Sequence, residues 1–108
     1  QLVPYSDGRL CWVGTICEEN PRGNRPRYPI IIGEVDGDTG ALQKESVSII
    51  DDRTPEDSED MTLSNFYVRE DRETGELVLY LPRAFAKGTR RPDGGYYGWP
   101  LLEYRLTV

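Results

Sequence analysis

The chain has 108 residues, of which 37% are hydrophobic and 30% charged, with a formal net charge of −6 at pH 7. Proteins that bind nucleic acid without regard to sequence need a basic face, so this acidic composition excludes that class. No apolar run approaches the roughly 20 residues of a transmembrane helix, so we predict no membrane span. The sequence opens with Gln1 and shows no signal peptide, and we expect a mature, trimmed or fragmentary chain.

Runs of β-branched and aromatic residues bounded by turn residues recur along the sequence, whereas helical periodicity is nearly absent. We predict an all-β fold with strands at residues 1–5, 10–17, 28–35, 41–50, 62–69, 76–82 and 100–107. Three tight turns share one arrangement, in which an acidic residue precedes a glycine and a leucine follows that glycine by two residues. These turns are DGRL (residues 7–10), DTGAL (38–42) and ETGEL (73–77).

Two cysteines, Cys11 and Cys17, lie in one predicted strand, where a spacing of six residues separates them by about 20 Å. A disulfide needs Cα atoms within about 7 Å, so the two thiols cannot pair inside that strand. The chain has neither the CxxC spacing of a zinc or redox site nor any histidine. We therefore expect buried thiols and no metal site.

Longer connections divide the strands into two groups. Residues 1–50 contain four predicted strands, residues 51–60 carry six acidic residues and a proline, and residues 61–108 contain three strands. Four antiparallel strands form one blade of a β-propeller. We predict a propeller fragment of about one and three-quarter blades, made of a complete blade (1–50), an acidic inter-blade loop (51–60) and a final, incomplete blade (61–108). The two blades are expected to form separate sheets packed face to face.

A self-contained small β domain is the alternative to a propeller fragment, and it would leave the edge of strand 100–107 uncovered. Without neighbouring blades, a propeller fragment would also expose apolar flanks and tend to associate. The flank residues expected to be exposed are Trp12, Ile30, Ile32 and Val78.

The long connections 18–26, 51–60 and 83–99 are predicted to lie on one face, because consecutive strands alternate in direction. They are rich in arginine, carboxylate and aromatic residues, whereas the tight turns on the other face are chemically plain. Functional residues concentrate on such longer loops. We therefore expect a binding site on the face that carries the long connections.

Three strings of the sequence resemble the end of sialidase-like bacterial glycoside hydrolases: NPRGNRPRYPI followed by IIGEVD (20–36), IIDDRTPEDS (49–58), and LSNF (63–66) before EDRETGEL (70–77). The resemblance implies that this chain is the C-terminal part of a secreted or periplasmic six-bladed propeller. Its partners would be the remaining blades of that propeller and a carbohydrate ligand. It further implies a carbohydrate-active enzyme without a cofactor, which binds an acidic or hydroxylated sugar on the face of the long loops.

The candidate sugar-binding residues are Arg25, Arg27, Asn65 and Asp52. Sialidases hold a sugar carboxylate with three arginines, and RYPI (residues 27–30) resembles the motif of the last of them. A planar guanidinium at the mouth of a strand suits this task, because it binds a carboxylate in a bidentate fork. The alternative is that these arginines pair on the loop face with Glu18, Glu19 or Asp51.

The family's tyrosine nucleophile lies in a Tyr-Ser-x-Leu motif, and the corresponding string here begins with Leu63. Leucine cannot attack an anomeric carbon, so we assign no catalytic residue to this chain and expect no activity from it alone. Asn65, on the same side of the strand, would donate a hydrogen bond to a sugar or satisfy the backbone of a neighbouring blade. A non-catalytic carbohydrate- or protein-binding propeller therefore remains the alternative to an enzyme.

Two further groups of residues have open roles. Asp51 and Asp52 are the nearest approach to the two carboxylates that glycoside hydrolysis needs, but a working partner would have to come from another blade. The acidic residues of 51–60 lack the spacing of a calcium loop, and a solvated loop is the simpler interpretation. Aromatic residues near the C-terminus, namely Tyr96, Tyr97 and Trp99, would stack on a sugar or cap the last strand.

Overall fold

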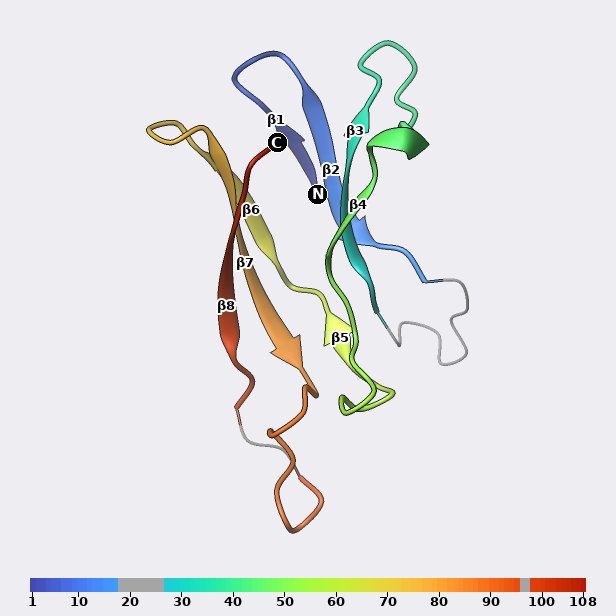
Figure 1. The fold of residues 1–108 in the computed structure, drawn as a ribbon, viewed down its shortest axis with the longest axis vertical. Coiled ribbons are helices and arrows are strands. Elements are labelled where there is room, and N and C mark those ends of the chain that lie inside the picture. Colours follow the sequence, from blue (N-terminus) through green and yellow to red (C-terminus); the bar gives the residue numbers. More distant parts are fainter. Residues whose placement is uncertain (18–26, 96–97) are drawn as a thin grey trace.

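The computed structural model describes residues 1–17, 27–95 and 98–108. The fold is all-β, as the sequence predicts, and consists of two four-stranded antiparallel sheets, neither of which closes on itself (Figure 1). The prediction of two separate sheets is confirmed. Among the described residues, no helix is both long enough and apolar enough to cross a membrane.

The first sheet is a meander whose strands pair in chain order. Its strands are β1 (Leu2–Pro4), β2 (Leu10–Thr15), β3 (Ile30–Val35) and β4 (Ser48–Asp51). The predicted strand 41–50 is shorter than expected, because a 3-10 turn, η1 (Lys44–Ser46), precedes β4. Ser46 accounts for the interruption: its hydroxyl accepts the Glu34 N–H at 2.7 Å and donates to the Gln43 carbonyl at 2.6 Å. A side chain thus takes the place of the backbone ladder there.

The second sheet is built around its longest strand, β7. Its strands are β5 (Thr62–Leu63), β6 (Tyr67–Asp71), β7 (Glu76–Ala84) and β8 (Leu101–Leu106). Strand β8 pairs along one edge of β7, and the Arg83 N–H donates to the Pro100 carbonyl on that side. Strands β5 and β6 pair in turn along the other edge, so the sheet is three strands wide.

The single predicted strand 62–69 is divided into β5 and β6 by a β-bulge. Leu63 pairs with Arg83 and Tyr67 with Tyr80, so three residues on one strand lie opposite two on the other. One of the two opposite residues is Pro82, which has no N–H to donate to this edge. A bulge at this place removes the need for the missing hydrogen bond.

One core lies between the two sheets. It combines inward-facing residues of the first sheet (Val3, Cys11, Val13, Ile30, Ile32) with Met61, Leu63, Val68, Leu77, Leu79, Leu81 and Ala86 from the second part of the chain. The expectation of exposed flanks was wrong for Ile30, Ile32 and Val78, all of which are buried. Ile30 and Ile32 face the other sheet, whereas Val78 lies between Arg69 and Arg105, whose alkyl chains can cover it.

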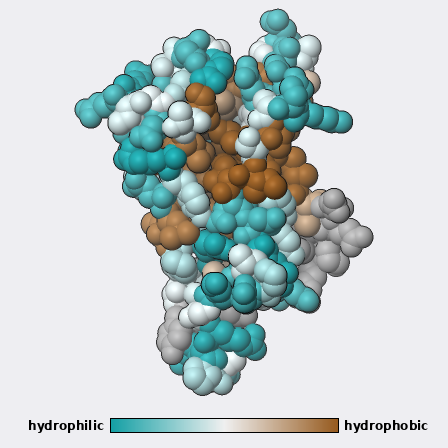
Figure 2. Space-filling model, in the orientation of Figure 1, coloured by the Kyte–Doolittle hydropathy of each residue, from teal (hydrophilic) through white to brown (hydrophobic). Residues whose placement is uncertain are grey.

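Contacts from the residues that flank β1 to the β6–β7 hairpin join the sheets along one side. The Gln1 carboxamide donates to the Val68 carbonyl at 2.9 Å and accepts its N–H at 3.2 Å, as a paired strand residue would. The Tyr5 hydroxyl donates to the Gly75 carbonyl, and Ser6 donates to the Glu70 carboxylate. On the opposite side, hydrophobic surface is visible between the two sheets (Figure 2).

Candidate functional site

A pocket of about 280 Å³ lies where β5 meets the end of β7. The residues that line it are Arg27, Thr62, Ser64, Asn65, Pro82, Ala84, Phe85 and Trp99. We call this site the Arg27 pocket. It brings together two of the predicted sugar ligands, Arg27 and Asn65, with Trp99, one of the aromatic residues whose role was left open. Arg25 lies outside the described residues.

The backbone of Arg27 is fixed to β5. Its carbonyl accepts the Leu63 N–H at 2.8 Å, its own N–H donates to the Met61 carbonyl at 3.4 Å, and it forms a parallel bridge with Thr62. Arg27 is half-buried and is the only charged residue among the described residues that line the pocket. A guanidinium among the lining residues can bind an anionic ligand.

The pocket contains two unusual backbone conformations. Asn65 has a φ of 57° and Phe85 a φ of 63°, and within the described part of the chain they are the two non-glycine residues with positive φ. Asparagine tolerates this left-handed region, whereas for phenylalanine it costs more. Such strained residues tend to occur at binding sites, where the surrounding structure holds them in place. Here they follow from the bulge after β5 and from the chain reversal after β7.

The aromatic side of the pocket is a pair of rings in edge-to-face contact. The ring centroids of Phe85 and Trp99 are 5.2 Å apart, with an interplanar angle of 62°. Trp99 remains 49% exposed, so the indole is held by its neighbour but still presents surface to solvent. An exposed indole with a fixed orientation can stack against the apolar face of a sugar ring.

Asp52 does not line the Arg27 pocket. It is exposed, its carboxylate accepts the Arg53 N–H at 2.7 Å, and its carbonyl accepts a weaker bond from Arg83 at 3.4 Å. The structure therefore separates Asp52 from Arg27 and Asn65. These contacts connect Asp52 to the fold of the acidic segment.

The acidic segment 51–60 is not simply a solvated loop, because Asp57 is buried with only 4% exposed. Its carboxylate accepts hydrogen bonds from the Thr54 N–H at 2.9 Å, the Thr54 hydroxyl at 3.0 Å and the Lys87 N–H at 2.6 Å, and pairs with Arg83 at 3.1 Å. Burial would raise the pKa of Asp57, but these bonds and the guanidinium together lower it below its ordinary value. Sequence analysis missed this role, although the Thr54-x-x-Asp57 spacing resembles a capping box.

Arg83 also connects the acidic segment to the last strand. It lies 3.4 Å from the carboxylate of Asp51, which accepts a hydrogen bond from the Tyr104 hydroxyl of β8. Burial and the neighbouring Asp51 raise the pKa of Tyr104 above its ordinary value. The arrangement ties β4 to β8. No group of three or more potential metal ligands occurs in the described ranges.

No family model, curated protein or solved structure matches this chain. The chemistry of the Arg27 pocket is therefore derived from its own geometry.

Proposed function

We propose that the chain binds an acidic sugar in the Arg27 pocket. The observation that carries this proposal is the meeting of Arg27, Asn65 and Trp99 in one small cavity that also contains both strained non-glycine residues. Arg27 binds the carboxylate and Trp99 stacks on the ring. The Asn65 amide and the hydroxyls of Thr62 and Ser64 exchange hydrogen bonds with sugar hydroxyls. A volume of about 280 Å³ suits a ligand of monosaccharide size.

The same proposal assigns the two sheets to neighbouring blades of a sialidase-like propeller. Support comes from the four-stranded antiparallel meander β1–β4, which is the strand arrangement of one propeller blade. Binding without hydrolysis is the function of this chain. Leu63 stands at the position where the sialidase motif has its nucleophilic tyrosine, and it is fully buried and has no group that could attack an anomeric carbon. No carboxylate that could serve as the acid/base lies among the described residues that line the pocket.

Calorimetric titration with glucuronate, N-acetylneuraminate and glucose tests this proposal. We expect both acidic sugars to bind more tightly than glucose. Arg27→Ala should weaken acidic-sugar binding by about 2 kcal/mol, or roughly 30-fold, because the ligand carboxylate loses its counter-charge. Arg27→Lys keeps the charge without the bidentate fork, so its affinity for acidic sugars should lie between those of the parent chain and Arg27→Ala.

Two variants separate binding from folding in this titration. Asn65→Gly suits the positive φ and should retain stability while it weakens sugar binding through loss of the amide. Arg91→Ala removes an exposed arginine that pairs with Asp93 outside the pocket, and it should bind as the parent chain does. If Arg27→Ala and Arg91→Ala bind glucuronate equally well, the carboxylate site is wrong.

A further inference from the structure

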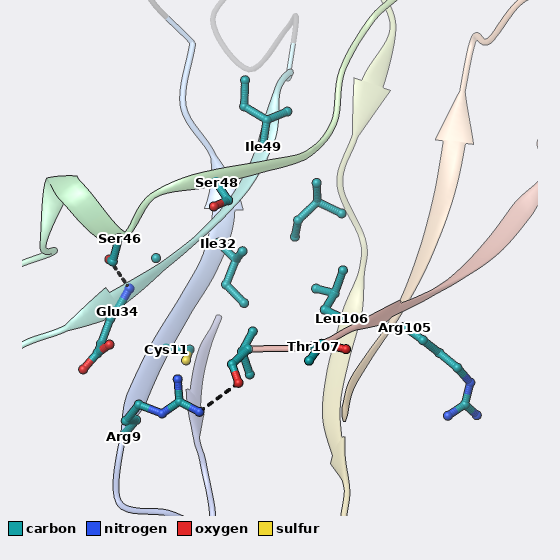
Figure 3. A pocket seen from close by; sticks show the side chains of 13 residues that line it. Arg9, Cys11, Ile32, Glu34, Ser46, Ser48, Ile49, Arg105, Leu106 and Thr107 are labelled. Carbon is teal, nitrogen blue, oxygen red and sulfur yellow. Dashed lines mark hydrogen bonds between the residues drawn. The ribbon is translucent and has the colours of Figure 1, made fainter. Parts of the chain in front are cut away.

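Strand β8 has a free edge beside a cavity whose lining is both polar and apolar. This second cavity, of about 490 Å³, lies in the opening between the sheets, and Ile32, Ile49 and Leu106 are among the residues that line it (Figure 3). Ile49 is 64% exposed and Val108 is 37% exposed. Strand β8 pairs only with β7 in the described structure. Free edges beside apolar surface are the places where another strand can add to a sheet.

The hydrogen bonding of β8 shows which residues offer backbone groups at the free edge. The Arg83 N–H donates to the Pro100 carbonyl, so the backbone groups of Pro100 face β7. Backbone groups alternate in direction along an antiparallel strand. The residues whose backbone N–H and C=O groups point toward β7 are therefore Leu102, Tyr104 and Leu106. Those with outward N–H and C=O groups are Leu101, Glu103 and Arg105, together with Thr107 just beyond the strand.

The side chains at this edge are charged, with both signs present. Glu103 and Arg105 lie on the solvent side of the sheet and pair with each other at 2.9 Å. Arg105 also lies 3.3 Å from both Asp71 and Glu76, so one guanidinium is shared among three carboxylates. Within this cluster, Glu103 and Arg105 are the two charged residues that belong to the edge strand itself.

We propose that β8 pairs antiparallel with β8 of a second copy of this chain, with Glu103 of each copy opposite Arg105 of the other. Neighbouring registers that also use the outward backbone groups place Glu103 opposite Glu103, or Arg105 opposite Arg105. Like charges directly opposite one another are destabilising and opposite charges stabilising, which selects the mixed register. The pairing has two-fold symmetry about Tyr104, as a closed dimer requires.

The proposed dimer also lies beside the apolar part of this cavity. Leu102 and Leu106 lie on the same face of β8, the face toward the cavity. In the register that places Glu103 opposite Arg105, Leu102 of one copy lies opposite Leu106 of the other. The partner strand therefore brings two leucines to the same face as Leu106, which lines the cavity. This proposal goes beyond sugar binding, since the residues that line the Arg27 pocket take no part in it.

Sedimentation equilibrium of the 108-residue chain over a range of concentrations tests the pairing. We expect a reversible monomer–dimer equilibrium. Glu103→Arg places arginine opposite arginine twice and should weaken dimerisation at least about tenfold. Glu103→Pro removes an outward N–H and should do the same while β7–β8 pairing survives. Glu73→Arg makes the same charge change in the exposed β6–β7 turn, and should dimerise like the parent chain.

A mixing experiment tests the register itself. Arg105→Glu should also be monomeric, but mixed in equal amounts with Glu103→Arg it should form a one-to-one heterodimer, because both charge pairs are restored. Circular dichroism and urea unfolding establish that each variant is folded. If Arg105→Glu does not fold, the dimerisation of Glu103→Arg and Glu103→Pro tests the proposal without it. A parent chain that stays monomeric at all concentrations overturns the proposal. So does a dimer that neither Glu103 variant weakens.

Discussion

Replacing Asp57 with alanine is expected to lower the free energy of unfolding by about 3 kcal/mol, at the lower end of the cost of breaking a buried ion pair, because Arg83 keeps Asp51 as a second partner. Asp57 is 4% exposed, and its carboxylate pairs with Arg83, whose side chain is only 17% exposed. The substitution also leaves the Thr54 and Lys87 backbone N–H groups without an acceptor. Urea unfolding followed by tryptophan fluorescence measures the loss. Glu59→Ala, at an exposed position of the same segment, should change stability by less than about 0.5 kcal/mol.

The contribution of Asp57 should depend on pH. Its pKa in the folded chain lies below the ordinary value of 3.8. The ionised form is therefore favoured by folding, and its contribution is complete above that value and is lost as the pH falls through the folded pKa. Asp57→Asn should flatten the stability profile in this acidic range. An unchanged profile would mean that Asp57 is not the buried anion of the segment.

Replacing Leu63 with alanine is expected to cost about 2–5 kcal/mol of stability without abolishing sugar binding. Leu63 is fully buried in the core, although it occupies the place where the sialidase-like pattern has a tyrosine. Urea unfolding gives the stability, and calorimetry with glucuronate gives the affinity of the folded chain. Leu2→Ala, at a position 56% exposed, should change stability little. A stable Leu63→Ala chain that no longer binds glucuronate would place Leu63 in the binding site.

The sequence was sufficient to predict where strands form, because runs of β-branched residues between turn signals determine local structure. It was not sufficient to predict which faces meet. Ile30 and Val78 were expected on exposed flanks, yet both are fully buried. Their burial depends on contacts between segments far apart in the chain. The division of strand 62–69 likewise depends on Pro82, which lies in a different strand.

The candidate site shows the same limit. No pattern in the sequence links Arg27 to Asn65, and it is the parallel bridge from Arg27 to β5 that brings them together. Phe85 was missed, because its place in the pocket follows from a positive φ that a phenylalanine gives no reason to expect. In the sequence, Asp57 is one acidic residue among six in the segment 51–60. Its burial requires the partner Arg83, and the sequence does not show that the two side chains meet.

The most direct test of sugar binding uses the two tryptophans of the chain, Trp12 and Trp99. Trp99 lines the Arg27 pocket, whereas Trp12 lies against Gly14 on the outer face of the first sheet, where a Cβ at position 14 would come within 2.3 Å of the indole. Each indole N–H gives its own signal in a ¹H–¹⁵N spectrum, so Trp12 is an internal control. Titration with glucuronate should shift the Trp99 indole and the Asn65 side-chain amide, and leave Trp12 in place. If the Trp99 signal is unmoved by glucuronate, or moves equally with glucose, the chain does not bind acidic sugars at this site.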